Sequence, residues 1–383
     1  MTLMPDTPTI LFAGGGTGGH IFPNLAVWER LAERGAPCRA HFALSNRSLD
    51  TDIIGKSELP FAQLVVRPWS SRPWHWPAFL LALSKAKKQV ARLIEERNIK
   101  AVVATGGYVS GPAIMAAAAR GLPIALVNLD AVPGKANRRL AASAPKTFTV
   151  YDSPLLPGAA RIGLPLRRSA VGLCDVRDAR ARLDLDPDRP TLMITGGSQG
   201  ALSVNEAVVQ LARHPQVQQV LEGWQILHIT GPGAPSRKGG ANGERIADAK
   251  SAYDALGIPS RVMPFCDAMG DAWRAATVAI SRSGAGAVAE AWTNATPTIF
   301  LPYPFHKDDH QRLNAEPLAA DGGCILLRDL KDAGANASQM VGPFMQLACD
   351  DAKRKVMIET LRESEPADGA DAVAHWVAQQ VGV

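Results

Sequence analysis

The stretch Thr9-Ile10-Leu11-Phe12-Ala13 runs directly into Gly14-Gly15-Gly16-Thr17-Gly18-Gly19-His20, and this junction decides the fold. A short, largely apolar run that ends in glycines is typical of a buried strand. Residues 21–33 then carry apolar side chains at helical spacing. A strand, a glycine loop and a helix in this order predict the first unit of a parallel α/β sheet.

The same pattern recurs along the chain. Residues 101–104 run into Gly106-Gly107 and an alanine-rich helix, and residues 191–195 run into a second glycine-rich loop, Gly196 to Gly200. Strands that alternate with helices favour doubly wound parallel sheets. We therefore expect an α/β protein with two Rossmann-like, doubly wound domains that face each other across a cleft. The expected domains are residues 1–165, completed by a C-terminal helix at 367–383, and residues 166–366.

Length and composition agree with this expectation. The chain has 383 residues, which suits two domains of ordinary size, and its 46% hydrophobic and 20% charged residues are typical of a globular protein. The five cysteines form no CxxC pair, which predicts neither a disulfide framework nor a zinc site. The N-terminus has no basic segment before a long apolar run, so we expect no signal peptide, and no window is long enough to span a membrane.

Charge is unevenly distributed. The net charge is +5 for the whole chain, but +9 for residues 1–165 and −4 for the remainder. A basic first half is compatible with an anionic membrane surface, a nucleic acid or acidic substrates, and also with ordinary scatter.

The glycine loops have a physical use at the ends of strands. Glycine lets the backbone approach a ligand closely, and the helix that follows presents N–H groups and a positive dipole end to an anion. A single loop of this kind often serves only as a connection. Three of them, at residues 14–19, 106–111 and 196–200, indicate phosphate-binding edges.

Two further segments carry polar groups just after strands. Residues 281–286 follow an apolar run and open a helix that contains Glu290, whose carboxylate could accept hydrogen bonds from a ribose; the alternative is a glutamate on the helix surface. Residues 302–315 concentrate polar side chains suited to sugar hydroxyls. The alternative there is a solvated loop whose following helix is capped by Asp308 or Asp309.

Five motifs make the chain recognisable: GGGTGGHIFPNLA, GGYVSGP, GGSQGALSVN, SRSGAGAVAE and DDHQRLNA, in that order. Together they resemble the MurG family, bacterial inverting transferases that move N-acetylglucosamine from UDP-N-acetylglucosamine (UDP-GlcNAc) to lipid I and so make lipid II for peptidoglycan. The resemblance runs from about residue 9 to the C-terminal helix. It implies two partners, UDP-GlcNAc and a polyprenyl-diphosphate-linked acceptor, and a peripheral location at the anionic cytoplasmic face of the inner membrane. It implies no nucleic acid and no required cofactor.

No metal is expected either. Asp50-Thr51-Asp52 and Asp184-Leu185-Asp186 match the DxD pattern that another transferase class uses to hold a divalent ion, and we interpret both as chance. Stimulation by a divalent cation is left open.

The resemblance places the acceptor in the first domain and the nucleotide sugar in the second. On the acceptor side it implies His20 as catalytic base, with Thr17, Gly18, Gly19, Tyr108 and Asn137 near the lipid diphosphate and the attacking hydroxyl. On the donor side it implies Arg167 near uridine, Ser198 and Gln199 at phosphate, Cys266 at uracil, Arg282, Ser283 and Gly284 at the helix start, Glu290 at ribose, and His310 and Gln311 at the sugar.

One departure concerns the acceptor side. Imidazole is suited to act as a base near neutral pH, although a structural histidine at residue 20 is the alternative. In the family, the strand that follows the GGYVSGP motif runs into a His-Glu-Gln-Asn stretch near the acceptor, where this chain has Val127, Asn128, Leu129 and Asp130. Asp130 could supply the missing carboxylate, as the base or as a group that orients His20.

The departure leaves other functions open. The acceptor could be a different lipid or glycoside, or the chain could be a UDP-sugar-binding homologue impaired in catalysis. A UDP-GlcNAc 2-epimerase shares the two-domain fold, but the glycine loops argue against it.

Residues 67–81 contain three of the eight tryptophans, Trp69, Trp74 and Trp76, and Lys85, Lys87, Lys88 and Arg92 follow on a predicted helix. Tryptophan flanked by cations is typical of a surface that lies among lipid headgroups. The alternative is a tryptophan-rich corner of the core beside a solvated helix.

Overall fold

The computed structural model describes residues 7–68, 72–197, 200–231, 242–364, 366 and 368–383. The chain divides into two compact units, Met1–Arg167 with Pro366–Val383, and Arg168–Glu365. Leu166 and Arg167, which the sequence placed in the second domain, therefore belong to the first unit.

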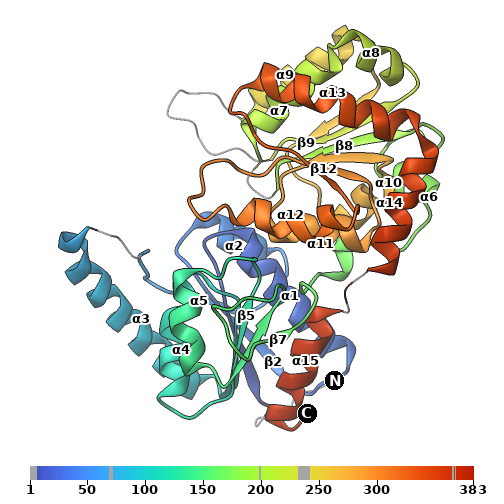
Figure 1. The fold of residues 1–383 in the computed structure, drawn as a ribbon. Coiled ribbons are helices and arrows are strands. Elements are labelled where there is room, and N and C mark those ends of the chain that lie inside the picture. The colour runs from blue at the N-terminus through green and yellow to red at the C-terminus, as the bar shows by residue number, and fades with distance from the viewer. Residues whose placement is uncertain (1–6, 69–71, 198–199, 232–241, 365, 367) are drawn as a thin grey trace. The chain divides into compact units, whose positions relative to one another are not determined.

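The first unit is a seven-stranded sheet in the order β3-β2-β1-β4-β5-β6-β7, with all neighbours parallel and helices on both faces (Figure 1). Its strands are β1 (Thr9–Ala13), β2 (Arg39–Leu44), β3 (Phe61–Gln63), β4 (Ile99–Ala104), β5 (Ile124–Asn128), β6 (Lys146–Thr149) and β7 (Ala160–Arg161). Its helices are α1 (Gly18–Glu33), α2 (Ser48–Gly55), η1 (Pro73–His75), α3 (Trp76–Glu96), α4 (Gly107–Ala118), α5 (Lys135–Leu140), η2 (Ala141–Ser143) and α15 (Gly369–Val381).

The second unit is a six-stranded parallel sheet in the order β10-β9-β8-β11-β12-β13. Its strands are β8 (Thr191–Thr195), β9 (Gln225–Ile229), β10 (Ser260–Met263), β11 (Val278–Ser281), β12 (Thr298–Phe300) and β13 (Ile325–Leu326). Its helices are η3 (Arg168–Ala170), α6 (Val176–Arg182), α7 (Leu202–Ala212), α8 (Pro215–Leu221), α9 (Asn242–Ala255), α10 (Met269–Ala275), α11 (Ala285–Thr293), α12 (His310–Ala320), α13 (Ala333–Cys349) and α14 (Asp351–Glu363).

The two sheets confirm the predicted fold class. Every residue of β1 and of β8 is buried, as expected for central strands covered by helices on both faces. Strand order reverses between β1 and β4 in one sheet and between β8 and β11 in the other. Open α/β sheets bind ligands beyond the carboxyl ends of the strands at such a reversal. The glycine loops after β1, β4 and β8 and the loop after β11 all lie at these points.

Ion pairs and hydrogen bonds link the start of the C-terminal helix α15 to α1. The guanidinium of Arg30, 3% exposed, donates from Nε to Oδ2 of Asp368 at 2.7 Å and from Nη2 to the carbonyl of Leu166 at 3.0 Å. Nε of Arg167 donates to Glu29, the neighbour of Arg30, at 2.8 Å. Both segments where the chain leaves and re-enters the first unit are therefore attached to α1, which explains why Leu166 and Arg167 pack there.

Candidate active site

The first glycine loop is held by side chains from the next βα unit. Gly16 has φ +91°, and its N–H donates to Oδ2 of Asp50 at 2.8 Å, while its carbonyl accepts from Nη1 of Arg47 at 2.7 Å. The same oxygen of Asp50 accepts from Oγ of Ser45 at 2.5 Å and from its N–H at 3.1 Å. Asp50, part of a DxD match on sequence, is fully buried and serves as an anchor of this loop.

The loop after β4 packs against the first glycine loop. Gly106 and Gly107 have φ +105° and +74°, and a Cβ atom on Gly107 would lie 3.0 Å from the carbonyl oxygen of Gly15. A Cβ on Gly106 would lie 3.0 Å from Oδ1 of Asn137, and one on Gly16 would lie 3.1 Å from the ring of Tyr108. The structure therefore brings two predicted acceptor residues, Tyr108 and Asn137, to the same pair of loops.

His20 lies in the first turn of α1, beside these loops. Its Nδ1 is 3.0 Å from the carbonyl oxygen of Thr105, and because a carbonyl only accepts, Nδ1 carries the hydrogen. Burial lowers the pKa of His20, an effect that Asp130 and Asp50 partly oppose by attraction of the charged ring. The imidazole is therefore neutral near pH 7 and keeps a lone pair on Nε2. This is the state required of a general base.

Asn128, the last residue of β5, organises the neighbouring segment. It is buried, and its Nδ2 donates to the carbonyl of Asp130 at 2.8 Å while its Oδ1 accepts from Nδ2 of Asn137 at 3.1 Å. The amide thus holds the backbone of Asp130 and the side chain of Asn137. Asp130 is close enough to His20 to influence its charge.

The remaining predicted acceptor residues form the start of α1. Thr17 is the extended residue before the helix, Gly18 is buried and Gly19 is exposed. The first backbone N–H groups of a helix lack intrahelical partners and favour anions. This helix start can receive a phosphate.

In the second unit, the loop after β8 also depends on glycine. Gly197 and Gly200 have φ +79° and +72°, and a Cβ on Gly200 would lie 2.3 Å from the carbonyl oxygen of Thr230. Ser198 and Gln199, predicted at phosphate, lie outside the described residues.

Arg282 is buried and its guanidinium contacts protein groups. Nη1 lies 2.8 Å from Oδ2 of Asp329 and donates to the carbonyls of Leu301 and Pro302, each at 2.9 Å, while Nη2 donates to Oγ of Ser203 at 2.6 Å. These contacts join the segments after β12 and β13 to the first turn of α7. They indicate that Arg282 positions the loops around the predicted donor site.

The start of α11 presents groups suited to an anion. Ser283 is buried, and its Oγ has no hydrogen-bond partner within the part of the chain that the structure describes. Gly284 caps the helix in extended conformation, and a Cβ there would meet nothing within 4 Å. Further along α11, Oε2 of Glu290 accepts from the indole N–H of the buried Trp273 at 2.7 Å, and burial raises the pKa of Glu290 to about 7.

The segment after β12 is ordered by its own side chains. Nδ1 of His310 lies 2.8 Å from Oδ1 of Asp308, and the imidazole of His310 stacks on that of His306 with centroids 4.2 Å apart. Oε1 of Gln311 accepts from the backbone N–H of Tyr303 at 2.9 Å, so the amide NH₂ is oriented as a donor.

Two further predicted donor residues have different surroundings. Cys266 is buried, and burial raises the pKa of its thiol, so it is a neutral group whose backbone is the part suited to contact a base. Arg167 belongs to the first unit, where it pairs with Glu29, and its contact with uridine stays a prediction.

Sequence reasoning missed the partners of these groups. Thr105, Trp273 and Asp329 each hold a predicted residue, and no local motif marks them. Asp50 and Asn128, noted in the sequence for other reasons, also hold predicted groups. No group of three or more His, Cys, Asp or Glu side chains able to hold a metal occurs among the described residues. Within the same ranges, no helix has the length and apolar character needed to cross a membrane.

The chain is similar to known proteins over nearly its whole length. Residues 10–149 match the N-terminal domain of glycosyltransferase family 28, and residues 191–341 match its C-terminal domain. The chain is 35% identical over 379 residues to a UDP-N-acetylglucosamine--N-acetylmuramyl-(pentapeptide) pyrophosphoryl-undecaprenol N-acetylglucosamine transferase of Clavibacter michiganensis, covering 97% of this chain and 96% of the relative. A transferase of the same name from a Nocardioides species is 32% identical over 377 residues, with 97% of each chain covered.

Among solved structures, Acinetobacter baumannii MurG superposes with a TM-score of 0.73 at 23% identity, covering 98% of this chain and all of the other. At this identity the likeness concerns the fold.

Proposed function

This chain belongs to glycosyltransferase family 28, and within it to the MurG family, and we propose that it transfers N-acetylglucosamine from UDP-GlcNAc to lipid I to make lipid II. The observation that carries the proposal is the match over nearly the whole chain to transferases named for this reaction. The polar groups at the strand-order reversal of each sheet supply the chemistry that the reaction needs.

In the proposed reaction, Nε2 of His20 takes the proton of the attacking acceptor hydroxyl. The hydroxyl oxygen forms a bond to the anomeric carbon as the bond from that carbon to the diphosphate oxygen breaks, which inverts the centre and releases UDP. The hydrogen bond from Nδ1 to the carbonyl of Thr105 fixes the ring with Nε2 as the proton acceptor. Asp130, through its attraction for the charged ring, stabilises the imidazolium that forms.

The acceptor diphosphate is proposed to lie at the start of α1. The backbone N–H groups of Thr17, Gly18 and Gly19 are placed to donate to it, and Tyr108 and Asn137 line the adjoining loops. The first glycine loop is thus proposed to bind the lipid substrate.

On the donor side, we propose that the positive end of α11 and the hydroxyl of Ser283 meet the charge of the departing diphosphate. Glu290 accepts from the ribose, the backbone at Cys266 contacts uracil, and His310 with Gln311 holds the sugar hydroxyls. Ser198 and Gln199 remain predicted phosphate ligands from sequence. The residues of the chain thus supply donors for the leaving group without a cofactor entering the scheme.

The start of α3 is proposed to contact the membrane. Trp74 is 71% exposed and Trp76, Leu80 and Leu81 are 45%, 59% and 58% exposed, which excludes a core position for these side chains. Figure 1 shows the start of α3 projecting away from the sheet. Trp69 lies outside the described residues.

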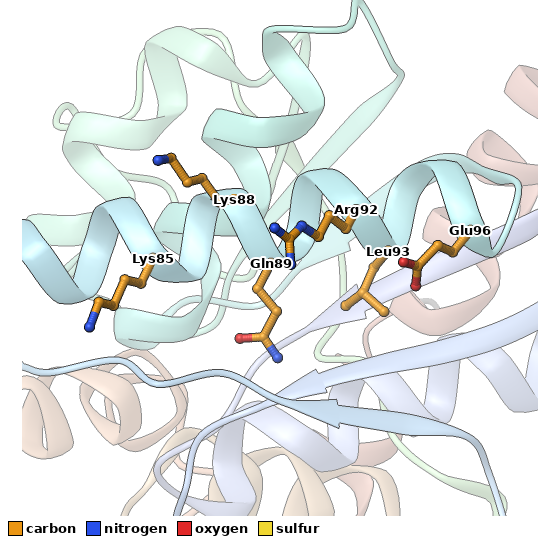
Figure 2. Close-up of a pocket in the computed structure, with 6 residues that line it drawn as sticks. All are labelled: Lys85, Lys88, Gln89, Arg92, Leu93 and Glu96. Atoms are coloured by element: carbon orange, nitrogen blue, oxygen red, sulfur yellow. The ribbon is translucent and has the colours of Figure 1, made fainter.

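Cations follow on the same helix. Figure 2 shows Lys85, Lys88 and Arg92 spaced along α3, around a shallow pocket to which Gln89 also contributes. An apolar end followed by cations suits a peripheral position on an anionic bilayer, and we propose the cytoplasmic face of the inner membrane.

The departure at Val127 and Asn128 favours one competing proposal, a different acceptor. The amide of Asn128 is bonded internally, so it does not replace the chemistry of a carboxylate. An assay that offers lipid I beside the same lipid diphosphate bearing other sugars separates the two. Preference for lipid I supports the main proposal, and transfer only to another acceptor supports the second.

A further inference from the structure

A buried histidine outside the proposed site links three elements of the second unit. His228 of β9 is fully buried, and both of its ring nitrogens are engaged: Nδ1 lies 3.0 Å from the hydroxyl of Tyr253 in α9, and Nε2 lies 3.2 Å from Oδ1 of Asn205 in α7. Tyr253 and Asn205 are buried as well.

The donor and acceptor in each of these hydrogen bonds can be assigned by starting from Asn205. Nδ2 of Asn205 donates to the carbonyl oxygen of Thr230 at 3.0 Å, so Oδ1 of Asn205 faces the ring and accepts from Nε2–H of His228. Burial lowers the pKa of His228 to about 3, so the ring is neutral and carries one hydrogen only. Nδ1 therefore accepts from the hydroxyl of Tyr253, and the three bonds run in one direction from Tyr253 to Thr230.

The chain of hydrogen bonds ends at the glycine turn before α7. The carbonyl oxygen of Thr230 lies so close to Gly200 that a Cβ there would be 2.3 Å from it. Gly200 has φ +72°, and its N–H donates to the carbonyl of Gly197 at 2.9 Å. Since Asn205 is part of α7 and the carbonyl of Thr230, which follows β9, lies against Gly200, the chain of hydrogen bonds links Gly200 to both elements.

We propose that His228 is a positioning residue for the donor substrate: through Asn205 and Thr230 it holds Gly200 and the start of α7 in the arrangement that receives the diphosphate of UDP-GlcNAc. The inference rests on the proposed function for the identity of the donor. Apart from Gln225 at the start of the strand, the other buried residues of β9 are apolar, and an apolar side chain at residue 228 would satisfy the core. The imidazole adds a direction to the hydrogen bonds that a leucine cannot supply.

The test compares His228→Leu with His228→Gln in the full chain, with UDP-GlcNAc binding measured by calorimetry beside steady-state kinetics. Because His228→Leu leaves Oδ1 of Asn205 without its hydrogen-bond donor, we expect Kd and the donor KM to rise about 10-fold or more, with the acceptor KM changed less than about 2-fold. The amide nitrogen of Gln reaches the position of Nε2, so His228→Gln should restore Kd to within about 3-fold of the original.

Gln225→Leu is the matched control. Gln225 is a buried polar residue at the opposite end of β9, where it bonds the carbonyl of Asp186 and Oγ1 of Thr191, away from the glycine turn. The Gln225→Leu variant should be less stable than the original chain yet bind UDP-GlcNAc with the same Kd. Unchanged binding by His228→Leu, or an equal loss with Gln225→Leu, would overturn the inference.

A spectroscopic measurement keeps the inference testable if His228→Leu does not fold. In nitrogen-15 NMR of the histidine-labelled chain, the resonances missing from His228→Gln identify His228 among the eight histidines. We expect a proton on Nε2 and none on Nδ1, unchanged between about pH 5 and pH 8. A proton on Nδ1, or titration in that range, refutes the direction of the chain.

The two proposals fail differently. A wild-type chain that binds UDP-GlcNAc but does not transfer to lipid I contradicts the proposed function and leaves the binding comparison valid. A wild-type chain that transfers, beside a His228→Leu variant that binds UDP-GlcNAc normally, contradicts only the role of His228.

Discussion

The indole N–H of Trp273 donates to Oε2 of Glu290 at 2.7 Å, so one oxygen of this carboxyl group is committed to the protein before any ligand binds. Burial raises the pKa of the same group to about 7. Burial of the ionised Glu290 side chain therefore lowers the free energy of unfolding, while Trp273 fixes its position. The other carboxylate oxygen is proposed to accept a hydrogen bond from a ribose. Replacing Glu290 should therefore stabilise the folded protein and weaken ligand binding.

The effect on stability depends on pH. The folded-state pKa of about 7 lies above the ordinary value of 4.5, so between these values the unfolded chain releases a proton that the folded chain retains. The free energy of unfolding should therefore fall as pH rises through this window and stay level above it. Glu290→Gln removes the effect and should raise the free energy of unfolding by about 1–3 kcal/mol at pH 8 and by little at pH 4. Urea unfolding at both pH values measures this, and an equal change at the two would contradict it.

Donor binding should show the opposite trend. A protonated carboxyl group accepts hydrogen bonds less well, so the affinity for UDP should decrease as pH falls below about 7. Glu290→Gln should bind about 10-fold more weakly at pH 8 and lose this pH dependence. Calorimetric titration with UDP across pH 5.5–8.5 checks the trend. Identical profiles for both proteins would remove Glu290 from the donor site.

His20 is expected to act in catalysis and not in donor binding. His20→Ala should lower kcat by about 10²–10⁴-fold, because the proton acceptor is lost, while UDP still binds to the second unit. Asp130→Asn keeps the shape of the side chain and should lower kcat by about 10-fold if Asp130 only stabilises the charged ring. Steady-state kinetics with saturating donor decide: near-normal turnover of His20→Ala, or a larger loss with Asp130→Asn, would transfer the role of base to Asp130.

The attachment of α15 should contribute to stability through Arg30. Its guanidinium is 3% exposed, while Asp368 is 35% exposed. Arg30→Met removes the ion pair to a partly buried carboxylate and should cost about 2–3 kcal/mol, somewhat less than for a fully buried pair. Arg34 forms a similar ion pair with Asp371 at the surface, 39% and 47% exposed, and Arg34→Met should cost less than about 1 kcal/mol. Equal losses in chemical denaturation would show that burial of Arg30 is not the cause.

The proposed membrane surface should respond to both apolar and charged substitutions. The double variant Trp74→Ser, Trp76→Ser should weaken binding to vesicles of anionic phospholipid about 10-fold or more, since both side chains are exposed. Replacing Lys85, Lys88 and Arg92 with glutamine should reduce the salt dependence of binding. Leu173→Ser, in the second unit and 84% exposed, is the control and should bind as the original does. Co-sedimentation at low and high salt measures all four proteins.

Much of the fold could be predicted because the central strands are buried on both faces. β1, residues 101–104 of β4, and β8 appear in the sequence as short, largely apolar runs followed by glycines, and the helices after them follow from spacing. β2 and β6 escaped prediction because Arg39, His41 and Lys146 interrupt their apolar pattern. β3 and β7 are too short, at 3 and 2 residues, to produce a periodic signal.

Only those residues of the candidate site that lie within sequence motifs could be predicted. The positions of His20 and Glu290 follow from the loops and helices that carry them. Their partners Thr105 and Trp273 are 85 and 17 residues away, and only the folded sheets bring them together. The direction of a side chain is equally hidden: Arg282 lies within a glycine motif, yet its guanidinium contacts Asp329 and two carbonyls inside the unit.

The most direct test of the central claim is transfer of radiolabelled N-acetylglucosamine from UDP-GlcNAc to lipid I by the purified chain in lipid vesicles. The account predicts one labelled sugar per acceptor, an equal amount of released UDP, and loss of both with His20→Ala. Tight binding of UDP without any transfer to lipid I would contradict it.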